Sequence, residues 1–150
     1  MIFVVASTGR FDALIEACER LADRYEFVGQ IGSSAFTPSF PHYRAAPPER
    51  IEADAARAEI VVSHGGSGTL SLLYRLRKPC VVVPRQRLYG APNDEQVAIA
   101  RKWAELGMAV LCLDVSQLEA AIATSRSRAF TFPTFPPLGD AIRPLLCSPA

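Results

Sequence analysis

The residues best suited to chemistry form a glycine-rich segment in the middle of the chain. Ser63-His64-Gly65-Gly66-Ser67-Gly68-Thr69 follows an apolar run, Ile60-Val61-Val62, and precedes an amphipathic run that begins near Leu70. This pattern predicts a strand, a tight turn and a helix. The glycines let the backbone approach an anion closely, and the free N–H groups at the helix start stabilise its charge. The segment therefore predicts a binding site for a phosphorylated ligand.

Three better-known glycine-rich motifs do not fully match this segment. A dinucleotide-binding fingerprint requires glycine where the chain has Ser71, and a P-loop requires a lysine after Gly68. A nucleophile elbow is nearly matched, because Gly65 and Ser67 are in place and only Thr69 departs from the pattern. A serine hydrolase that uses Ser67 is therefore an alternative, although both histidines of the chain precede this serine.

The elements that must position the segment follow from alternating apolar runs and helical patterns. Strands are predicted at Ile2–Ala6, Phe27–Ile31, near Tyr43, Ile60–Ser63, Cys80–Pro84 and Ala109–Leu113, and helices at Phe11–Asp23, Pro48–Ala58, Gly68–Leu76, Asp94–Leu106 and Ser116–Ala123. Apolar strands separated by helices predict an α/β fold, a doubly wound Rossmann-like parallel sheet. Ligands of such sheets bind outside the carboxyl ends of the strands. We therefore expect the loops Ser7–Arg10, Ser63–Thr69 and Arg85–Gln96 to lie along one edge.

Length and composition limit the class of protein. The 150 residues predict one domain, and a net charge of +1 with scattered charges predicts no nucleic-acid partner. The four cysteines include no C-x-x-C pair, so we expect buried free thiols, no metal cofactor and a cytoplasmic setting. The apolar start at Ile2–Ala6 is too short for a signal peptide, and no apolar run is long enough to span a membrane. We therefore expect the chain to be soluble.

Three ordered motifs resemble those of a glycosyltransferase family. The first is Val5-Ala6-Ser7-Thr8-Gly9-Arg10-Phe11, and the second is Ser63-His64-Gly65-Gly66-Ser67-Gly68 followed by Lys78-Pro79 and an apolar strand. The third is Asn93-Asp94-Glu95-Gln96 before a helix. Together they resemble the family 28 C-terminal, nucleotide-sugar-binding half of a GT-B fold. They are most similar to the small subunits of two-chain transferases that act on dolichol-linked or exopolysaccharide precursors.

The resemblance implies transfer of a sugar from a nucleoside diphosphate sugar, with UDP-sugar as the expected donor, to a lipid-linked glycan acceptor. The amides and hydroxyls of the glycine-rich segment would bind the diphosphate, and Asn93 and Gln96 would bind the donor sugar. The expected substrate-binding residues are Ser7, Thr8, Gly9, Ser63, Gly65, Gly66, Ser67, Gly68, Thr69, Arg85, Asn93, Asp94, Glu95 and Gln96, and the catalytic candidate is His64.

Structural roles are the alternatives for several of these residues. His64 could hydrogen-bond only to the backbone, and Ser67 and Thr69 could serve as helix N-caps. Arg85 could face an anionic substrate or a membrane surface, or it could be an ordinary exposed arginine. The segment 93–96 could be no more than a helix start.

The resemblance also implies a missing half, because a GT-B enzyme works in a cleft between two domains. We expect a membrane-anchored partner subunit that carries the acceptor site and the general base, and hence a cytoplasmic chain that is peripheral to the membrane through this partner. The nucleotide-sugar-binding domain would span 1–150, with a Phe/Pro-rich tail and a short helix in 130–150. One departure from the family is Leu72, where relatives carry a ribose-binding glutamate. A non-catalytic nucleotide- or sugar-phosphate-binding module is therefore a further alternative.

Overall fold

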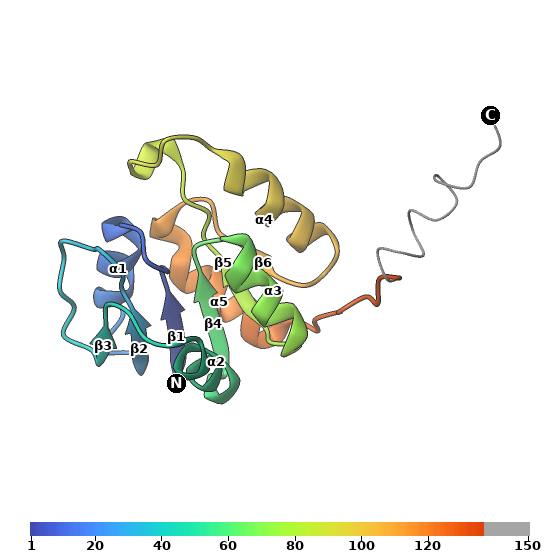
Figure 1. Cartoon of the computed structure of the whole chain (residues 1–150), viewed down its shortest axis with the longest axis horizontal. Helices are drawn as coiled ribbons and strands as arrows, with labels where there is room; N and C mark the ends of the chain where they lie inside the picture. The colour runs from blue at the N-terminus through green and yellow to red at the C-terminus, as the bar shows by residue number, and fades with distance from the viewer. Residues whose placement is uncertain (137–150) are drawn as a thin grey trace.

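A parallel sheet of six strands forms the centre of the domain, as the computed structural model of residues 1–136 describes it (Figure 1). The strands are β1 (Ile2–Val5), β2 (Phe27–Gln30), β3 (His42–Tyr43), β4 (Ile60–Ser63), β5 (Cys80–Val82) and β6 (Val110–Leu111), in the order β3-β2-β1-β4-β5-β6. Val5 is aligned with Gln30 on one side and with Ser63 on the other. The predicted doubly wound parallel sheet is confirmed.

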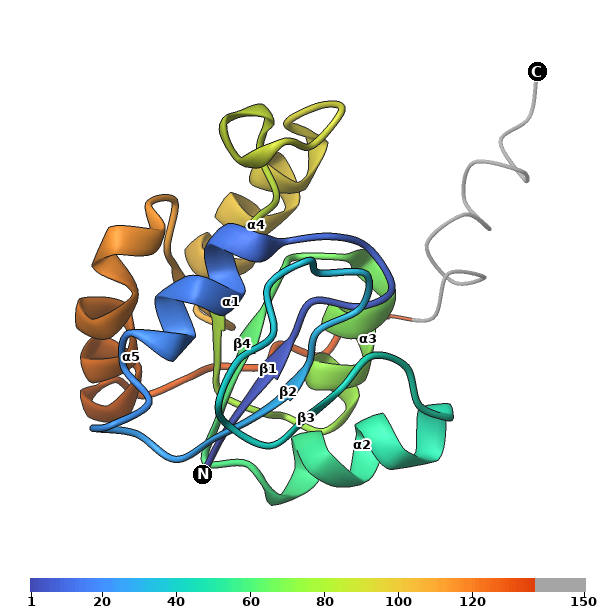
Figure 2. The ribbon, with the colours of Figure 1, turned by 90° about the vertical axis from the view of Figure 1, so that its left-hand side faces the viewer.

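Helices cover both faces of this sheet (Figure 2). On one face lie α1 (Asp12–Glu19) and α5 (Leu118–Ser127), and on the other lie α2 (Pro48–Arg57), α3 (Ser67–Arg75) and α4 (Glu95–Glu105). Successive side chains of a strand point to opposite faces. Ile2 and Val4 accordingly belong to the core under α1 and α5, whereas Phe3 and Val5 belong to the core under the other three helices.

The topology places the predicted loops together. The chain begins in the middle of the sheet at β1, moves outward to β2 and β3, and then returns to lay β4 beside β1. The carboxyl ends of β1 and β4 therefore form the point at which the strand order reverses, where open α/β sheets bind their ligands. The loops that follow β1, β4 and β5 lie on this edge, as predicted.

Some element bounds differ from the sequence-based prediction. The helix predicted over Phe11–Asp23 ends at Glu19 and continues as tight turns through Tyr25. The last strand has only two residues, because β6 is an edge strand that pairs with β5 alone. The last helix begins later and ends later than predicted, at Leu118–Ser127, since a short 3₁₀ turn, η2 (Val115–Gln117), precedes it. A second 3₁₀ turn, η1 (Arg87–Tyr89), was not predicted.

The first part of the Phe/Pro-rich tail packs on the domain itself. Phe130 packs against the core under α1 and α5, and Thr131 hydrogen-bonds to the backbone of Leu106 and Gly107. Tyr74 donates to the Pro133 carbonyl at 2.6 Å. The predicted C-terminal helix and Cys147 lie outside the described residues. The other three cysteines, at positions 18, 80 and 112, are buried free thiols. Among residues 1–136, no helix is long and apolar enough to cross a bilayer.

Candidate functional site

The turn after β4 is stabilised from within by its own first residues. Gly65 has a φ of +86°, a conformation that favours glycine, and its N–H donates to the buried Ser63 hydroxyl at 3.3 Å. A Cβ on Gly66 would collide with the His64 ring directly beneath it. Ser63 and Gly65 therefore shape the turn, and the Gly65 amide that was expected to bind the diphosphate is already occupied.

The donors that remain free belong to the start of α3. Gly66 is the N-cap residue and no side chain caps the helix, so the alternative that Ser67 and Thr69 serve only as N-caps does not hold. No described residue accepts a hydrogen bond from the N–H groups of Ser67, Gly68 or Thr69. Ser67 and Gly68 are exposed, and a Cβ on Gly68 would meet nothing within 4 Å. These three amides can bind an anion without displacing any protein contact.

His64 lies under this turn as a neutral ring. It is 4% exposed, and its Nδ1 lies 3.1 Å from the Val5 carbonyl, which can only accept, so Nδ1 carries the proton. Burial, together with the positive charge of Arg85, lowers the pKa of His64 to about 4. The ring thus supports the turn between β1 and β4 and carries no charge near neutral pH. Its assignment as a catalytic residue stays a prediction.

The loop after β1 lies against the loop after β2. Ser7 has a φ of +59°, and a Cβ on Gly32 would collide with the backbone of Ser7 and Gly9. Only a glycine at position 32 allows this close approach of the two loops. Ser7 faces a pocket between α2 and α3, whereas Thr8 is exposed on the other side of the loop.

Arg85 supports the same loop from below. Its guanidinium donates to the Ala6 carbonyl, packs against Gly9 and lies 5.9 Å from the centroid of the Phe11 ring. Burial lowers the pKa of Arg85, and its Nε is buried without a hydrogen-bond partner among the described residues. The side chain is neither an ordinary exposed arginine nor directed away from the domain.

The predicted residues at the start of α4 are held by local contacts. Asn93 accepts from the Glu95 amide at 3.1 Å, and Asp94 accepts from the Arg87 amide at 2.8 Å. The side-chain carbonyl of Gln96 accepts from the Arg85 amide at 3.2 Å, which joins the end of β5 to α4. Glu95 is exposed. Within residues 1–136, the side-chain nitrogen of Gln96 donates to no acceptor and could reach a ligand.

A pocket of about 320 Å³ adjoins the free amides of α3. Its lining residues come from the β1 loop, α2 and α3, and are Ser7, Pro48, Ile51, Glu52, Gly68, Thr69, Leu72 and Arg75. Ile51 and Leu72 make part of it apolar, and Glu52 pairs with Arg75 at 2.9 Å. None of the α2 residues was among the expected site residues, because no local pattern shows that α2 lies opposite α3.

Two other kinds of chemistry, hydrolysis by a serine nucleophile and metal binding, each need a specific group of side chains. Neither histidine hydrogen-bonds to Ser67, since His42 contacts the Phe40 carbonyl and His64 contacts the Val5 carbonyl. Ser67 therefore lacks the hydrogen bond to a histidine base that a serine nucleophile requires, as far as residues 1–136 are concerned. In the same range, no three His, Cys, Asp or Glu side chains are grouped so that they could hold a metal ion.

Comparison with solved structures finds the same fold in larger glycosyltransferases. The glycotransferase of kitacinnamycin is 24% identical with a TM-score of 0.62, and the match covers 85% of this chain and 35% of that one. The calicheamicin glycosyltransferase CalG4 is 17% identical with a TM-score of 0.64, covering 85% and 34%. SsfS6 from Streptomyces sp. SF2575, solved with thymidine diphosphate, is 22% identical with a TM-score of 0.62, covering 85% and 33%.

These likenesses show the fold. The chain spans about a third of the length of each of these solved structures. None of the curated protein sequences matches it. The model of the glycosyltransferase family 28 C-terminal domain matches residues 1–131. The fold, the glycine-rich turn and this match agree, and the chain belongs to the glycosyltransferase family 28 C-terminal domain family.

Proposed function

We propose that this domain binds the donor of a glycosyl transfer reaction, a nucleoside diphosphate sugar. The diphosphate would lie over the start of α3, where the N–H groups of Ser67, Gly68 and Thr69 have no acceptor among the described residues. This row of free donors beside an open pocket is the observation that carries the proposal. As the sugar leaves, negative charge develops on the diphosphate, and prearranged donors stabilise that charge without a metal ion.

The nucleoside would occupy the pocket between α2 and α3. Gly68 and Thr69 belong both to the free helix start and to the pocket wall, so one ligand can reach both. Pro48, Ile51 and Leu72 offer apolar contact to a base or ribose. SsfS6, which has this fold, was solved with thymidine diphosphate, and this supports a nucleoside diphosphate as the ligand.

Transfer would require a second domain, because the chain spans only about a third of the compared glycosyltransferases. A membrane-anchored partner subunit would carry the acceptor site and the general base. The acceptor itself would be a lipid-linked glycan. The domain would then act in the cytoplasm at the membrane surface through that partner. The free amide nitrogen of Gln96 at the α4 start would bind hydroxyls of the donor sugar.

Calorimetric titration of the full chain with UDP, TDP, GDP and ADP tests donor binding. We expect saturable binding of at least one nucleotide and an affinity about tenfold lower in Gly68→Ala, because the new methyl group would enter open space that the proposal assigns to the ligand. Ser71→Ala, on the exposed face of the same helix, is the matched control and should bind as the wild type. Absence of binding by every nucleotide, or equal affinity in Gly68→Ala, would contradict the proposal.

A transfer assay separates a transferase subunit from a non-catalytic binding module. The chain would be mixed with a candidate membrane-anchored partner, a radiolabelled sugar nucleotide and membranes that carry lipid-linked acceptors. The transferase proposal predicts labelled lipid only when both chains are present. Nucleotide binding without transfer in any such mixture would favour the binding module.

A further inference from the structure

A second hollow lies on the carboxyl edge of the sheet, on the other side of the β1 loop from the α2/α3 pocket. Its volume is about 310 Å³, and its lining residues are Thr8, Gly32, Ser33, Arg44 and Ala45. Most of the exposed lining is apolar, and its polar side chains are Arg44, Thr8 and Ser33, all three exposed; no carboxylate lines the hollow. Thr8 was among the expected substrate-binding residues, but none of the five has a place in the proposed function.

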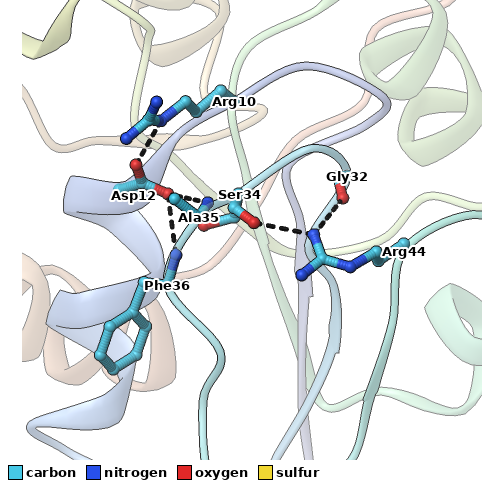
Figure 3. Close-up of polar contacts among 7 residues, drawn as sticks. All are labelled: Arg10, Asp12, Gly32, Ser34, Ala35, Phe36 and Arg44. Atoms are coloured by element: carbon cyan, nitrogen blue, oxygen red, sulfur yellow. Dashed lines mark hydrogen bonds and ion pairs between the residues drawn. The ribbon is translucent and has the colours of Figure 1, made fainter.

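Arg44 is held in one orientation by the loop after β2. Its Nη1 donates to the Ser34 carbonyl at 2.7 Å and to the Gly32 carbonyl at 3.2 Å (Figure 3). No described residue accepts from its Nη2 or Nε, and Arg44 forms no ion pair within residues 1–136. Nη1 thus fixes the guanidinium, while the N–H groups of Nη2 and Nε bond to no described residue. A guanidinium that is already oriented suits the paired oxygens of a phosphate.

The loop that orients Arg44 is itself anchored. The Asp12 carboxylate accepts from the Ser34 hydroxyl and from the Ala35 and Phe36 amides, and it pairs with Arg10 (Figure 3). Burial alone would raise the pKa of Asp12, but these hydrogen bonds lower it to about 2. The carboxylate therefore stays ionised, and its oxygens are taken up by the loop amides, the Ser34 hydroxyl and Arg10 rather than by Arg44.

From this arrangement we propose that the hollow around Arg44 is a second anion site, which binds a phosphate or diphosphate group. Arg44 would supply charge-assisted hydrogen bonds, and Thr8 and Ser33 would add hydroxyl donors. The site is separate from the start of α3 and does not depend on nucleotide binding there. Because Gly32 packs directly on the Ser7–Gly9 loop, an anion in this hollow lies next to the wall of the α2/α3 pocket.

The test is a ¹H–¹⁵N NMR titration of the full chain with inorganic pyrophosphate at constant ionic strength, following the Arg44 side-chain signal and the Gly32 and Ser33 amides. We expect saturable shifts in the wild type and about tenfold weaker binding in Arg44→Gln, the loss of a charge-assisted contact. Arg101→Gln removes the same charge from the exposed face of α4 and should titrate as the wild type. Ser33→Asp leaves Arg44 and its two carbonyl anchors in place and should abolish binding.

Two further ligands identify the source of the phosphate. If geranyl diphosphate shifts the Arg44 signals and UDP shifts only the signals of the Gly68 region, the anion in this hollow is the diphosphate of a lipid. UDP that shifts both regions would assign it to the nucleotide. Either result supports a second anion site. Shifts that do not saturate, or that are equal in wild type, Arg44→Gln and Ser33→Asp, would overturn it whatever happens at α3.

Discussion

The starts of α3 and α4 both carry motif residues at the carboxyl edge, but they differ in how their polar groups are used. At α3 the amides of Ser67, Gly68 and Thr69 have no partner among the described residues. At α4 the side-chain oxygens of Asn93, Asp94 and Gln96 all accept hydrogen bonds from nearby backbone amides. A motif position can thus serve the ligand, the fold or both, and the hydrogen-bond partners distinguish these cases.

The largest effect that we expect concerns the support under the α3 turn and its dependence on pH. The pKa of His64 is lowered from 6.5 to about 4, so the unfolded state binds its proton at a higher pH than the folded state. The stabilisation is complete above pH 6.5 and is lost as the pH falls towards 4. Linkage gives a loss of roughly 2 to 3 kcal/mol in unfolding free energy between pH 7 and pH 4.5.

Urea denaturation at a series of pH values measures this loss, with His64→Gln as the comparison. The variant keeps an amide donor for the Val5 carbonyl but has no group that titrates in this range. Its unfolding free energy should change much less between pH 7 and pH 4.5. An identical pH dependence in both proteins would show that His64 is not the sensitive group.

Gly66→Val tests the same support sterically. The new Cβ would collide with the His64 ring, and overpacking of this kind costs about 1 to 3 kcal/mol. We therefore expect a lower midpoint in thermal or urea unfolding. Gly68→Val is the control, because its side chain would enter open space. Equal stability of the two variants would contradict the close contact between Gly66 and His64.

Leu72→Ala separates the nucleoside part of the α3 site from the phosphate part. Leu72 lines the pocket but belongs to the second turn of α3, beyond the free amides. The variant should bind UDP or TDP about fivefold more weakly, since apolar contact of about 1 kcal/mol is lost, and should bind inorganic pyrophosphate unchanged. Calorimetry with both ligands measures the two affinities. Equal weakening for both would place the nucleoside elsewhere.

The smallest effect is expected at α4, where Gln96 links the helix to the end of β5. Gln96→Ala leaves the Arg85 amide with the His64 carbonyl, at 3.3 Å, as its acceptor, and the loss of the Gln96 bond should lower the unfolding free energy by about 0.5 to 1 kcal/mol. Gln96→Glu keeps an acceptor oxygen and should be as stable as the wild type. Chemical denaturation at neutral pH distinguishes them. Destabilisation by Gln96→Glu as large as by Gln96→Ala would argue against this link.

Much of the architecture could be predicted because it depends on local patterns. The bounds of β4 were predicted correctly, since Ile60–Ser63 is an apolar run between clear breaks. The end of α1 was predicted less well, because residues after Glu19 keep a helical pattern while their amides form tighter turns. The short β6 could not be foreseen, since its length depends on a single neighbouring strand.

The location of the site was predicted, but the role of each residue within it was not. The glycine-rich segment was singled out correctly as the turn before α3, yet the Gly65 amide is bonded to Ser63 and the Arg85 side chain lies beneath the β1 loop. Glu52 and Arg44 were missed altogether. Glu52 and Arg44 are distant in sequence from the β1 loop residues Ser7 and Thr8 that line the same hollows, and no motif marks either one.

The parallel α/β fold, the order of its loops and the glycine-rich turn before a helix can all be read from the residues along the chain. These properties follow from the periodicity of apolar residues and from backbone freedom at glycine, which act over a few neighbouring residues. The folded domain, in contrast, establishes which donors are free within residues 1–136, that His64 is neutral, and that α2 and the β2 loop complete the two hollows. Hydrogen-bond partners, burial and pocket walls are contributed by segments far apart in the chain, so no local pattern contains them.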